Sequence, residues 1–444
     1  MGLRAAQFLV RVLVPLAALV WAGAGALAGE VNAGEAKVGG EGVVATAARV
    51  VAVAAGGGGT EFRLDMSAGV PVEVYTLANP YRVVIDLPGI GFKLDPLAGQ
   101  AGGGLVTAYR FGALAGGQAR IVIDTAGPVA ITKAVMTNIT ASGGRPAGGV
   151  RLAVGLASMD ARAFGEGTGA AKAAAKLPAV KPAVFEDADS GQAIKSRPVV
   201  MIDPGHGGID PGAVGGQKTT EKTVVLAVAL RLRAALEAGG RFDVRLTRAD
   251  DVFVPLDKRV ELSRTERADI FISLHADAIE DSAQAKAVRG ASIYTLSDKA
   301  SDEQARMMAD KENAADLVAG FTQVPGENPD EIKGILFDLM NRETAVFSHV
   351  LSRALTEAMG KSGALAREPE RAAAFRVLKQ AHAPSVLVEL GFLSNPVEEQ
   401  MMMEAGWQSR TAKAIAAAVE AYFTAKARAG TSVPARAALG RLPP

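Results

Sequence analysis

The sequence contains no cysteine, and this absence excludes every chemistry that depends on a thiol. Disulfide bonds, thiolate nucleophiles and cysteine-ligated zinc are ruled out, so a metal site in this chain must use His, Asp or Glu. Histidine is scarce as well, with 4 residues in 444. Any catalytic or metal-binding imidazole must be one of these four.

An excess of charge of either sign is also missing. Lys and Arg number 48 and Asp and Glu number 47, which gives a formal net charge of +1. This balance does not provide the basic surface that nucleic acid binding requires. We therefore expect no nucleic acid partner, and nothing in the sequence indicates an oligomeric state.

The first residues have the pattern of an export signal. Arg4 and Arg11 form a basic region, residues 12–22 are apolar, and Ala26-Leu27-Ala28 is typical of a cleavage site. The apolar run is short for a membrane span, which needs about 20 residues. We predict a Sec-type signal peptide over residues 1–28 and no stable membrane span after its removal. An uncleaved anchor is the alternative.

Short segments of alternating apolar and polar residues follow residues 30–59, which are rich in Gly, Ala and Val and are expected to form a loose lead-in. Gly, Pro and Asn separate these segments, which is typical of a small all-β domain of the sandwich kind, placed at residues 43–160. The domain contains no histidine, so we expect it to bind rather than to catalyse. Its expected strands include 62–66, 71–77, 81–87, 120–124 and 150–154.

Residues 161–196 are rich in Ala, Gly, Lys and Pro and are predicted to be a flexible linker. From 197 to 426 buried-strand runs alternate with helical patterns, which predicts an α/β domain with a mostly parallel twisted sheet flanked by helices. The expected strands are 199–202, 244–247, 270–274, 292–296 and 386–390, and the expected helices are 221–238, 255–267, 302–319, 335–359 and 408–425. Residues 427–444 are predicted to be a disordered tail.

Two histidines follow strands of the predicted α/β domain. His206 lies in the Gly-rich loop after the strand at 199–202, and His275 follows the strand at 270–274. Ligands bind beyond the carboxyl ends of strands in such sheets, so both imidazoles are expected at one crevice. Glu221 begins the next helix, where Thr219 and Thr220 offer an N-cap. Two His and one carboxylate form a catalytic zinc set with an open fourth position.

Glu389 ends the apolar strand 385–390 and is the expected proton acceptor beside the metal-bound water. Zinc lowers the pKa of bound water to about 7 and polarises the attacked carbonyl.

Each of the four residues also has an alternative, purely structural explanation. His206 suits a turn, His275 a core, Glu221 a helix start, and Glu389 a pair with Arg371 or Arg376. His349 and His382 are expected to be structural.

Several segments around these residues form a recognisable set of motifs. They are Val200–Gly212 (VMIDPGHGGIDPG), Glu221 at a helix start, Leu246-Thr247-Arg248, Leu256 with Arg259, Phe271–Ala276 (FISLHA) and Glu389–Pro396 (ELGFLSNP). These motifs resemble those of zinc-dependent N-acetylmuramoyl-L-alanine amidases of the cell-separation type, and the resemblance covers residues 198 to about 425. It implies that His206, Glu221 and His275 are zinc ligands and that Glu389 is the catalytic carboxylate, with peptidoglycan as the substrate.

The β-rich domain is similar to the AMIN domain found ahead of such amidases, chiefly through Val83–Pro88 (VVIDLP). This resemblance implies binding to the wall and recruitment to the division septum, and hence a periplasmic location. Two departures from the amidase pattern are visible. Asp277 stands where Asn is frequent, and Ser263-Arg264 stands where Ala-Asn is common.

Glu312 lies on the apolar face of the predicted helix 302–319, whereas Glu303 points the opposite way. A carboxylate on an apolar stripe needs a partner. Amidases of this type resemble enzymes that a helix across the zinc cleft keeps inactive until a LytM-type activator displaces it. We therefore expect Glu312 to occupy the open zinc position at rest. A pair between Glu312 and an arginine at a packing surface is the alternative.

The sequence is also compatible with two other functions. One is a catalytically silent wall-binding or regulatory protein, although such proteins usually lose metal ligands that this chain keeps. The other is a different zinc peptidoglycan hydrolase, such as a carboxypeptidase or a deacetylase, which spacing alone does not exclude.

Overall fold

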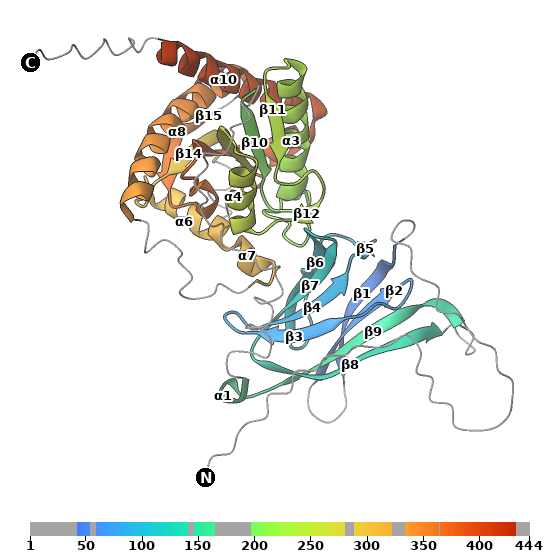
Figure 1. The fold of residues 1–444 in the computed structure, drawn as a ribbon. Helices are drawn as coiled ribbons and strands as arrows, with labels where there is room; N and C mark the ends of the chain where they lie inside the picture. Colours follow the sequence, from blue (N-terminus) through green and yellow to red (C-terminus); the bar gives the residue numbers. More distant parts are fainter. Residues whose placement is uncertain are drawn as a thin grey trace, which may run out of the picture. The chain divides into compact units, whose positions relative to one another are not determined.

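A computed structural model describes residues 42–53, 59–140, 146–164, 197–279, 288–321, 334–363 and 365–431. The chain divides into two compact units, a β unit and an α/β unit (Figure 1). The predicted signal peptide (1–28), residues 165–196 of the predicted linker and residues 432–444 of the predicted tail lie outside the described residues. Residues 161–164, at the start of the predicted linker, and residues 427–431, at the start of the predicted tail, are helical. No helix in the described ranges is long and apolar enough to cross a bilayer.

The β unit contains two sheets, as the alternating patterns predict. One has the order β5 (Gly91–Phe92), β1 (Val44–Val53), β2 (Gly59–Met66), β9 (Pro146–Ser158) and β8 (Val129–Thr140). The other contains β6 (Val106–Leu114), β7 (Gln118–Thr125), β4 (Arg82–Pro88) and β3 (Glu73–Leu77) in that order. Alternate side chains of both sheets, such as Phe62 and Leu64 of β2 and Val83 and Ile85 of β4, form one core. The sandwich-like all-β class is confirmed.

One expectation for the β unit was wrong. The Gly- and Ala-rich lead-in over residues 30–59 includes strand β1 (Val44–Val53), which pairs antiparallel with β2. The strand consists mostly of Ala and Val and shows no regular alternation of apolar and polar residues. It lies between strands β5 and β2, and several of its side chains are partly exposed. A short helix, α1 (Ala161–Phe164), follows the last strand.

The α/β unit is built on a sheet of six strands. Its order is β11 (Asp243–Leu246), β10 (Val199–Pro204), β13 (Ile270–His275), β16 (Ser385–Glu389), β14 (Ala291–Leu296) and β15 (Leu365–Ala373). All neighbours are parallel except β14 and β16, which are antiparallel. The predicted mostly parallel sheet flanked by helices is confirmed. The unit also contains the short strand β12 (Val252–Phe253) and a 3-10 turn at Arg376–Leu378.

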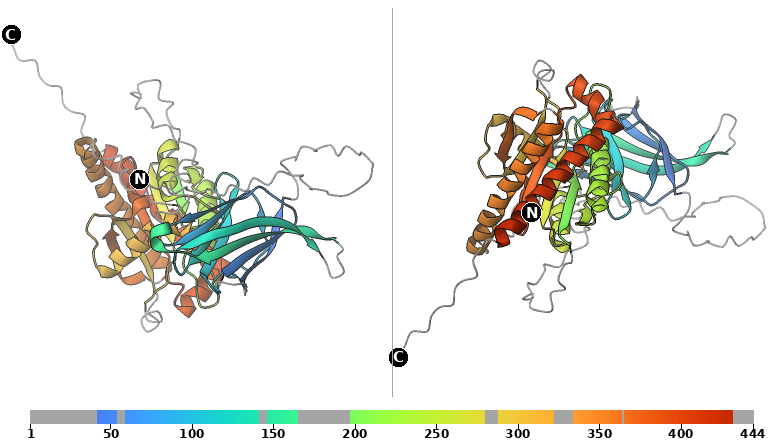
Figure 2. Two further views of the ribbon diagram at one scale, coloured as in Figure 1. Left: turned by 90° about the horizontal axis from the view of Figure 1, so that it is seen from below. Right: turned by 90° about the horizontal axis from the view of Figure 1, so that it is seen from above.

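Long amphipathic helices cover the sheet. The helices of the unit are α3 (Glu221–Ala238), α4 (Leu256–Thr265), α6 (Glu303–Asn313), α7 (Ala315–Val318), α8 (Gly334–Ser362), α9 (Pro396–Met403) and α10 (Ala405–Thr431). Helix α10 lies between α8 and α3 (Figure 2). Leu232 of α3, Leu355 of α8 and Ile415 of α10 are fully buried in one core with the strand residues Ile272 and Val388.

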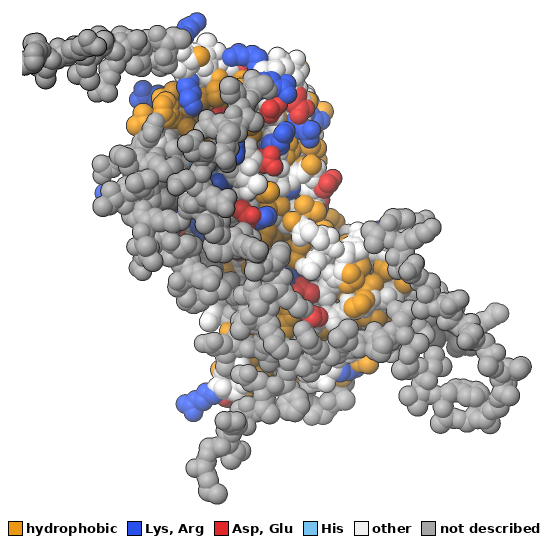
Figure 3. All heavy atoms as spheres, viewed as in Figure 1, with side chains coloured by type: hydrophobic (Ala, Val, Ile, Leu, Met, Phe, Trp, Pro, Cys, Tyr) orange, Lys and Arg blue, Asp and Glu red, His pale blue; other side chains and the backbone are white. Residues whose placement is uncertain are grey.

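On the surface, basic and acidic side chains are interspersed where Figure 3 is not grey, in line with the balanced composition.

The bounds of helix α3 agree with the prediction, but the helix expected over 302–319 is two helices. The break lies at Ala314, next to Asn313, whose side chain donates to Ala374 O and accepts from Arg376 N. These contacts come from distant residues and leave no local sequence signal. Strand β15 was not predicted either. It contains Pro369 and lies at the sheet edge, where proline is tolerated and alternation is not required.

We expect Leu274→Ala to destabilise the α/β unit strongly. Leu274 is fully buried on central strand β13, and removal of such a side chain costs about 2–5 kcal/mol through lost burial and the cavity left behind. Urea denaturation followed by circular dichroism measures the change. Val397→Ala, at a side chain that is 66% exposed, is the control and should change stability little. Equal effects of the two variants would contradict the described core.

Candidate metal centre

The parallel strands β10, β13 and β16 bring the predicted site residues to one edge of the sheet. His206 follows β10, His275 ends β13 and Glu389 ends β16, where the strand register pairs His275 with Glu389. Helix α3, which the loop after His206 leads into, contributes Glu221 at its first position. All four predicted residues are therefore neighbours at the carboxyl ends of the strands.

His206, Glu221, His275 and Glu312 form a compact buried cluster. One ligand atom from each residue lies within 4.8 Å of the others. His206 Nε2 is 3.1 Å from Glu221 Oε2 and 3.3 Å from Glu312 Oε2. His275 Nδ1 is 3.0 Å from Glu221 Oε1 and 3.1 Å from Glu312 Oε2. Each imidazole thus contacts both carboxylates.

Glu221 is held rigidly by the backbone. Its side chain is fully buried, Oε1 accepts from Ala276 N at 2.8 Å, and Oε2 accepts from Ala213 N at 2.9 Å. Thr220 is the N-cap residue of α3, as expected, but its side chain makes no capping bond, because its hydroxyl pairs with that of Thr223. The direction of the Glu221 carboxylate is consequently set by two N–H donors outside the helix.

Two arginines and a buried aspartate fix the loop that carries His206. Arg259 donates to His206 O at 2.9 Å and to Asp203 Oδ1 at 2.8 Å. Arg248 donates to Gly205 O at 2.7 Å. Thr247 and Ser273 also donate to Asp203. Burial opposes the charge on Asp203, but Arg259 and these donors lower its pKa, so Asp203 remains a carboxylate that anchors Arg259.

Two positions in the loop require glycine. A Cβ at Gly205 would lie 2.4 Å from His275 Cε1. Gly212 has φ +66°, and a Cβ there would lie 2.7 Å from both Glu221 Oε2 and His206 Cδ2. The absence of these side chains is what lets the loop approach both imidazoles and the Glu221 carboxylate.

The donor set fits a tetrahedral divalent cation. Four ligands about 2.0–2.1 Å from a zinc ion lie about 3.3 Å from one another, close to the separations in the cluster. Two buried carboxylates also need positive charge between them. Burial acts against a charged His275, yet Glu312 and Glu221 raise its pKa to about 10. Glu312 Oε1 is buried without a hydrogen-bond partner. These features suit a site for a cation bound by two nitrogens and two oxygens.

Glu389 lies beside this cluster but outside the four-residue group. Its side chain is fully buried, Oε2 accepts from Asp277 N at 3.2 Å, and Oε1 has no hydrogen-bond partner. Burial is the main cause that raises the pKa of Glu389 well above its ordinary value, and nearby carboxylates act in the same direction. The expected alternative, a pair with Arg371 or Arg376, does not occur. Arg371 contacts Asp302 and Gln304, and Arg376 contacts Asp257 and Asp316.

Helix α6 covers the cluster with its buried face. Glu312 is 5% exposed and contacts both histidines, so the expected alternative of an arginine partner does not apply. The adjacent Lys311 forms an ion pair with Asp277. The cavity that remains beside His206, His275 and Glu312 measures about 10 Å³. This is at the lower limit for one water molecule and leaves no room for a substrate.

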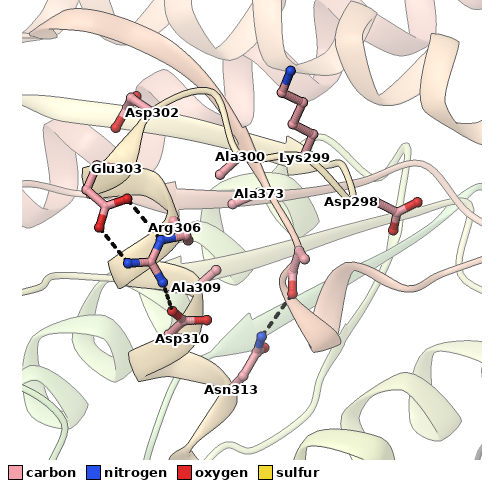
Figure 4. A pocket seen from close by; sticks show the side chains of 11 residues that line it. Asp298, Lys299, Ala300, Asp302, Glu303, Arg306, Ala309, Asp310, Asn313 and Ala373 are labelled. Atoms are coloured by element: carbon pink, nitrogen blue, oxygen red, sulfur yellow. Dashed lines mark hydrogen bonds and ion pairs between the residues drawn. The ribbon is translucent and has the colours of Figure 1, made fainter.

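The opposite face of α6 borders a surface pocket of about 380 Å³ (Figure 4). Arg306 there pairs with Glu303 and Asp310 on its own helix, and Asn313 donates to Ala374 O. Glu303 therefore points away from the metal centre, as the helical periodicity predicts.

The supporting roles of Asp203, Arg248 and Arg259 were not predicted from the sequence. Asp203 had a local signal, because it is an aspartate at the end of an apolar strand. Lys311 was missed because its partner Asp277 is distant in the chain. The remaining histidines lie elsewhere: His382 Nε2 is 3.2 Å from Ser263 Oγ, and His349 is exposed on α8.

Comparison with known proteins gives two family matches. Residues 200–421 match the model described as N-acetylmuramoyl-L-alanine amidase, and residues 50–146 match the AMIN domain model. Over 235 residues the chain is 40% identical to N-acetylmuramoyl-L-alanine amidase AmiC of Escherichia coli O6:H1, covering 52% of this chain and 55% of that protein. Over 229 residues it is 40% identical to AmiA of Salmonella typhimurium, covering 51% of this chain and 77% of that protein.

Among solved structures, the catalytic domain of CwlV, an N-acetylmuramoyl-L-alanine amidase from Bacillus (Paenibacillus) polymyxa var. colistinus, is 27% identical with a TM-score of 0.38. That alignment covers 51% of this chain and 98% of the solved chain. The chain spans just over half the length of the AmiC relative.

We expect Zn²⁺ to stabilise the chain against heat through the buried cluster. A ligand that binds only the folded state adds about 2.7 kcal/mol when its free concentration is about 100 times Kd. Differential scanning calorimetry with and without Zn²⁺ measures the shift in Tm. His206→Ala should lose most of it, and His349→Ala, on the exposed side of α8, should keep it. A full shift in His206→Ala would mean that the ion binds elsewhere.

Proposed function

The chain belongs to the N-acetylmuramoyl-L-alanine amidase family, and from this premise we propose that it hydrolyses the amide bond between N-acetylmuramic acid and L-alanine in peptidoglycan. The observation that supports this proposal is the buried cluster of His206, Glu221 and His275 next to Glu389, inside the family match over residues 200–421. Nothing else among the described residues combines two imidazoles with carboxylates in this way.

Zinc is the proposed cofactor, with His206, Glu221 and His275 as its ligands. When bound, zinc would supply Lewis acidity that activates water and polarises the substrate carbonyl. The protein's contribution is orientation. The backbone N–H groups of Ala213 and Ala276 hold Glu221, and Arg259 holds the backbone of His206. Such supporting contacts keep ligands aligned with the ion.

Glu389 is the proposed proton carrier. Its buried carboxylate has a raised pKa, so it is able to accept a proton from the attacking water at Oε1 or Oε2 and to release it to the leaving amine of L-alanine. The N–H of Asp277 orients Oε2, while Oε1 has no protein partner and is available for this transfer.

We expect Glu389→Gln to retain zinc and to lose hydrolysis. The amide keeps the shape of the side chain but cannot accept a proton, and loss of a general base lowers the rate by about 10²–10⁴-fold. Zinc content by atomic absorption and release of soluble fragments from purified peptidoglycan provide the measurements. Glu370→Gln, at an exposed position of β15, is the control with unchanged rate. Full activity of Glu389→Gln would contradict the assigned role.

Mass spectrometry of the digest separates the proposed reaction from its alternatives. An amidase releases intact stem peptides that begin with L-alanine. A carboxypeptidase would instead release a terminal amino acid, and a deacetylase would release acetate. A silent wall-binding protein would release nothing, even from a variant in which Glu312 no longer contacts the two histidines.

The resting state is proposed to be autoinhibited, with Glu312 as a fourth ligand of the ion. Glu312 Oε2 is 3.3 Å from His206 Nε2 and 3.1 Å from His275 Nδ1, at the position that a substrate oxygen would need. The cavity of about 10 Å³ beside it excludes a glycan strand or stem peptide. Displacement of α6 would open both the metal position and the cleft.

We expect Glu312→Ala to raise basal peptidoglycan hydrolysis, because it removes the carboxylate that blocks the ion. Glu303→Ala, on the exposed face of the same helix, should leave the basal rate unchanged. Dye-labelled peptidoglycan release without an activator measures both. Unchanged hydrolysis in Glu312→Ala, in a variant that still binds zinc, would rule out inhibition through this side chain.

The remaining expectations concern location and partners. The basic and apolar N-terminal segment supports Sec export to the periplasm, and the AMIN match over residues 50–146 supports recruitment to the septal wall during cell separation. A LytM-type protein is the proposed activator that displaces α6. These assignments rest on the resemblance and on the family match.

A further inference from the structure

Asp277 of the α/β unit contacts both the proposed proton carrier and the helix that covers it. It follows strand β13 closely in the chain and is 5% exposed. Its backbone N–H donates to Glu389 Oε2 at 3.2 Å. Its carboxylate oxygen Oδ1 accepts from the ammonium group of Lys311 on α6. A carboxylate with an ammonium partner therefore lies directly beside Glu389.

The position of Asp277 does not depend on α6. Its Oδ1 also accepts from Ala278 N at 2.6 Å, and its backbone O accepts from Leu393 N at 2.7 Å. Together with the bond to Glu389, these contacts fix Asp277 to the end of β13 and to the loop after β16. We therefore expect the carboxylate to keep its place when α6 moves away. Lys311 would leave with the helix, and Asp277 would then lack its cation.

A second observation shows that this corner of the site has room in its bonding for a donor. Glu389 is fully buried, and its Oε1 has no hydrogen-bond partner. A buried carboxylate without a positive partner is costly, so two neighbouring carboxylates favour a cation between them. The Lys311 side chain is 41% exposed, which places this corner at the rim of the covered cleft. A peptide attached to such a cation could extend into solvent.

The two neighbouring side chains of α6 have the charges of the two products of amide hydrolysis. In that reaction a water molecule is added across the C–N bond. The carbon takes its oxygen and becomes a carboxylate, and the nitrogen takes both protons and leaves as an ammonium group. The Glu312 carboxylate lies beside His206 and His275, and the Lys311 ammonium lies at Asp277, next to the group that would deliver a proton to the nitrogen.

We propose that Asp277 binds the ammonium group of the released L-alanine, and that Lys311 occupies this position in the resting state. This inference rests on the proposed function. Once Glu389 has given its proton to the leaving nitrogen, it is a carboxylate again, and the new ammonium group lies between two carboxylates. Hydrogen bonds between charged groups are the stronger kind, so Asp277 favours departure of the amine. A pair that served only to attach α6 would need no affinity for a free amine.

The test measures amine binding by the zinc-loaded full chain in which Lys311→Ala and Glu312→Ala are combined, since this variant removes both charged groups that α6 contributes. L-Alaninamide is the probe because it carries the α-ammonium group of L-alanine. N-Acetyl-L-alaninamide has the same frame without the charge. Isothermal titration calorimetry gives both affinities.

Two further substitutions are added to this variant one at a time. Asp277→Asn removes the charge but keeps the backbone N–H that donates to Glu389. Asp310→Asn is the matched control, because Asp310 pairs with Arg306 on the exposed face of α6 (Figure 4).

We expect L-alaninamide to bind about tenfold or more tightly than the acetylated ligand, and Asp277→Asn to abolish this preference, as loss of a hydrogen bond between charged groups would produce. Asp310→Asn should retain the preference. Equal affinity for the two ligands with Asp277 present would overturn the site, and this comparison does not require the Asp277 variant to fold. A preference that survives in Asp277→Asn would overturn it as well.

Hydrolysis of labelled peptidoglycan separates this inference from the proposed function. Adding Asp277→Asn to the Glu312→Ala chain should lower its rate by about tenfold or more. An unchanged rate would overturn the assignment of the bound ammonium to the leaving group. An amine preference that depends on Asp277, without any hydrolysis by Glu312→Ala, would instead contradict the proposed function and leave the ammonium site in place.

Discussion

The structure of the α/β unit depends on two buried carboxylates, Glu221 and Glu312, that share the same pair of imidazoles. Like charges in a buried site repel strongly unless positive charge lies between them. Strand ends, a glycine-dependent loop and the first turn of α3 all serve to bring these groups within 4.8 Å. Helix α6 adds the fourth member of this group, because Glu312 on its buried face contacts both imidazoles.

Much of this site was visible in the sequence because its signals are local. The local patterns of strands that end in His275 and Glu389, and of a helix that begins with Glu221, predict both the residues and their position at the edge of the sheet. Parallel strands then guarantee that their carboxyl ends meet. The position of Glu312 on the buried face of α6 follows from helical periodicity in the same way.

The parts that the sequence did not predict depend on contacts between distant residues. The break at Ala314 follows from the bonds between Asn313 and residues near Arg376, and strand β15 forms at an edge without alternation. Arg259 was part of a motif, but its bonds to Asp203 and His206 O exist only after folding. Asp277 stood out as a departure from the family pattern, and its ion pair with Lys311 now gives that departure a structural explanation.

Lys311 and Glu312 are adjacent and oppositely charged, and each contacts a group of the opposite kind in the α/β unit. This arrangement sets the register of α6 on the cleft. A shift that put Lys311 in the place of Glu312 would bring an ammonium group toward the imidazoles and the carboxylate of Asp310 toward Asp277. Both attractive contacts would then be lost together, so the two neighbouring side chains disfavour this change of register.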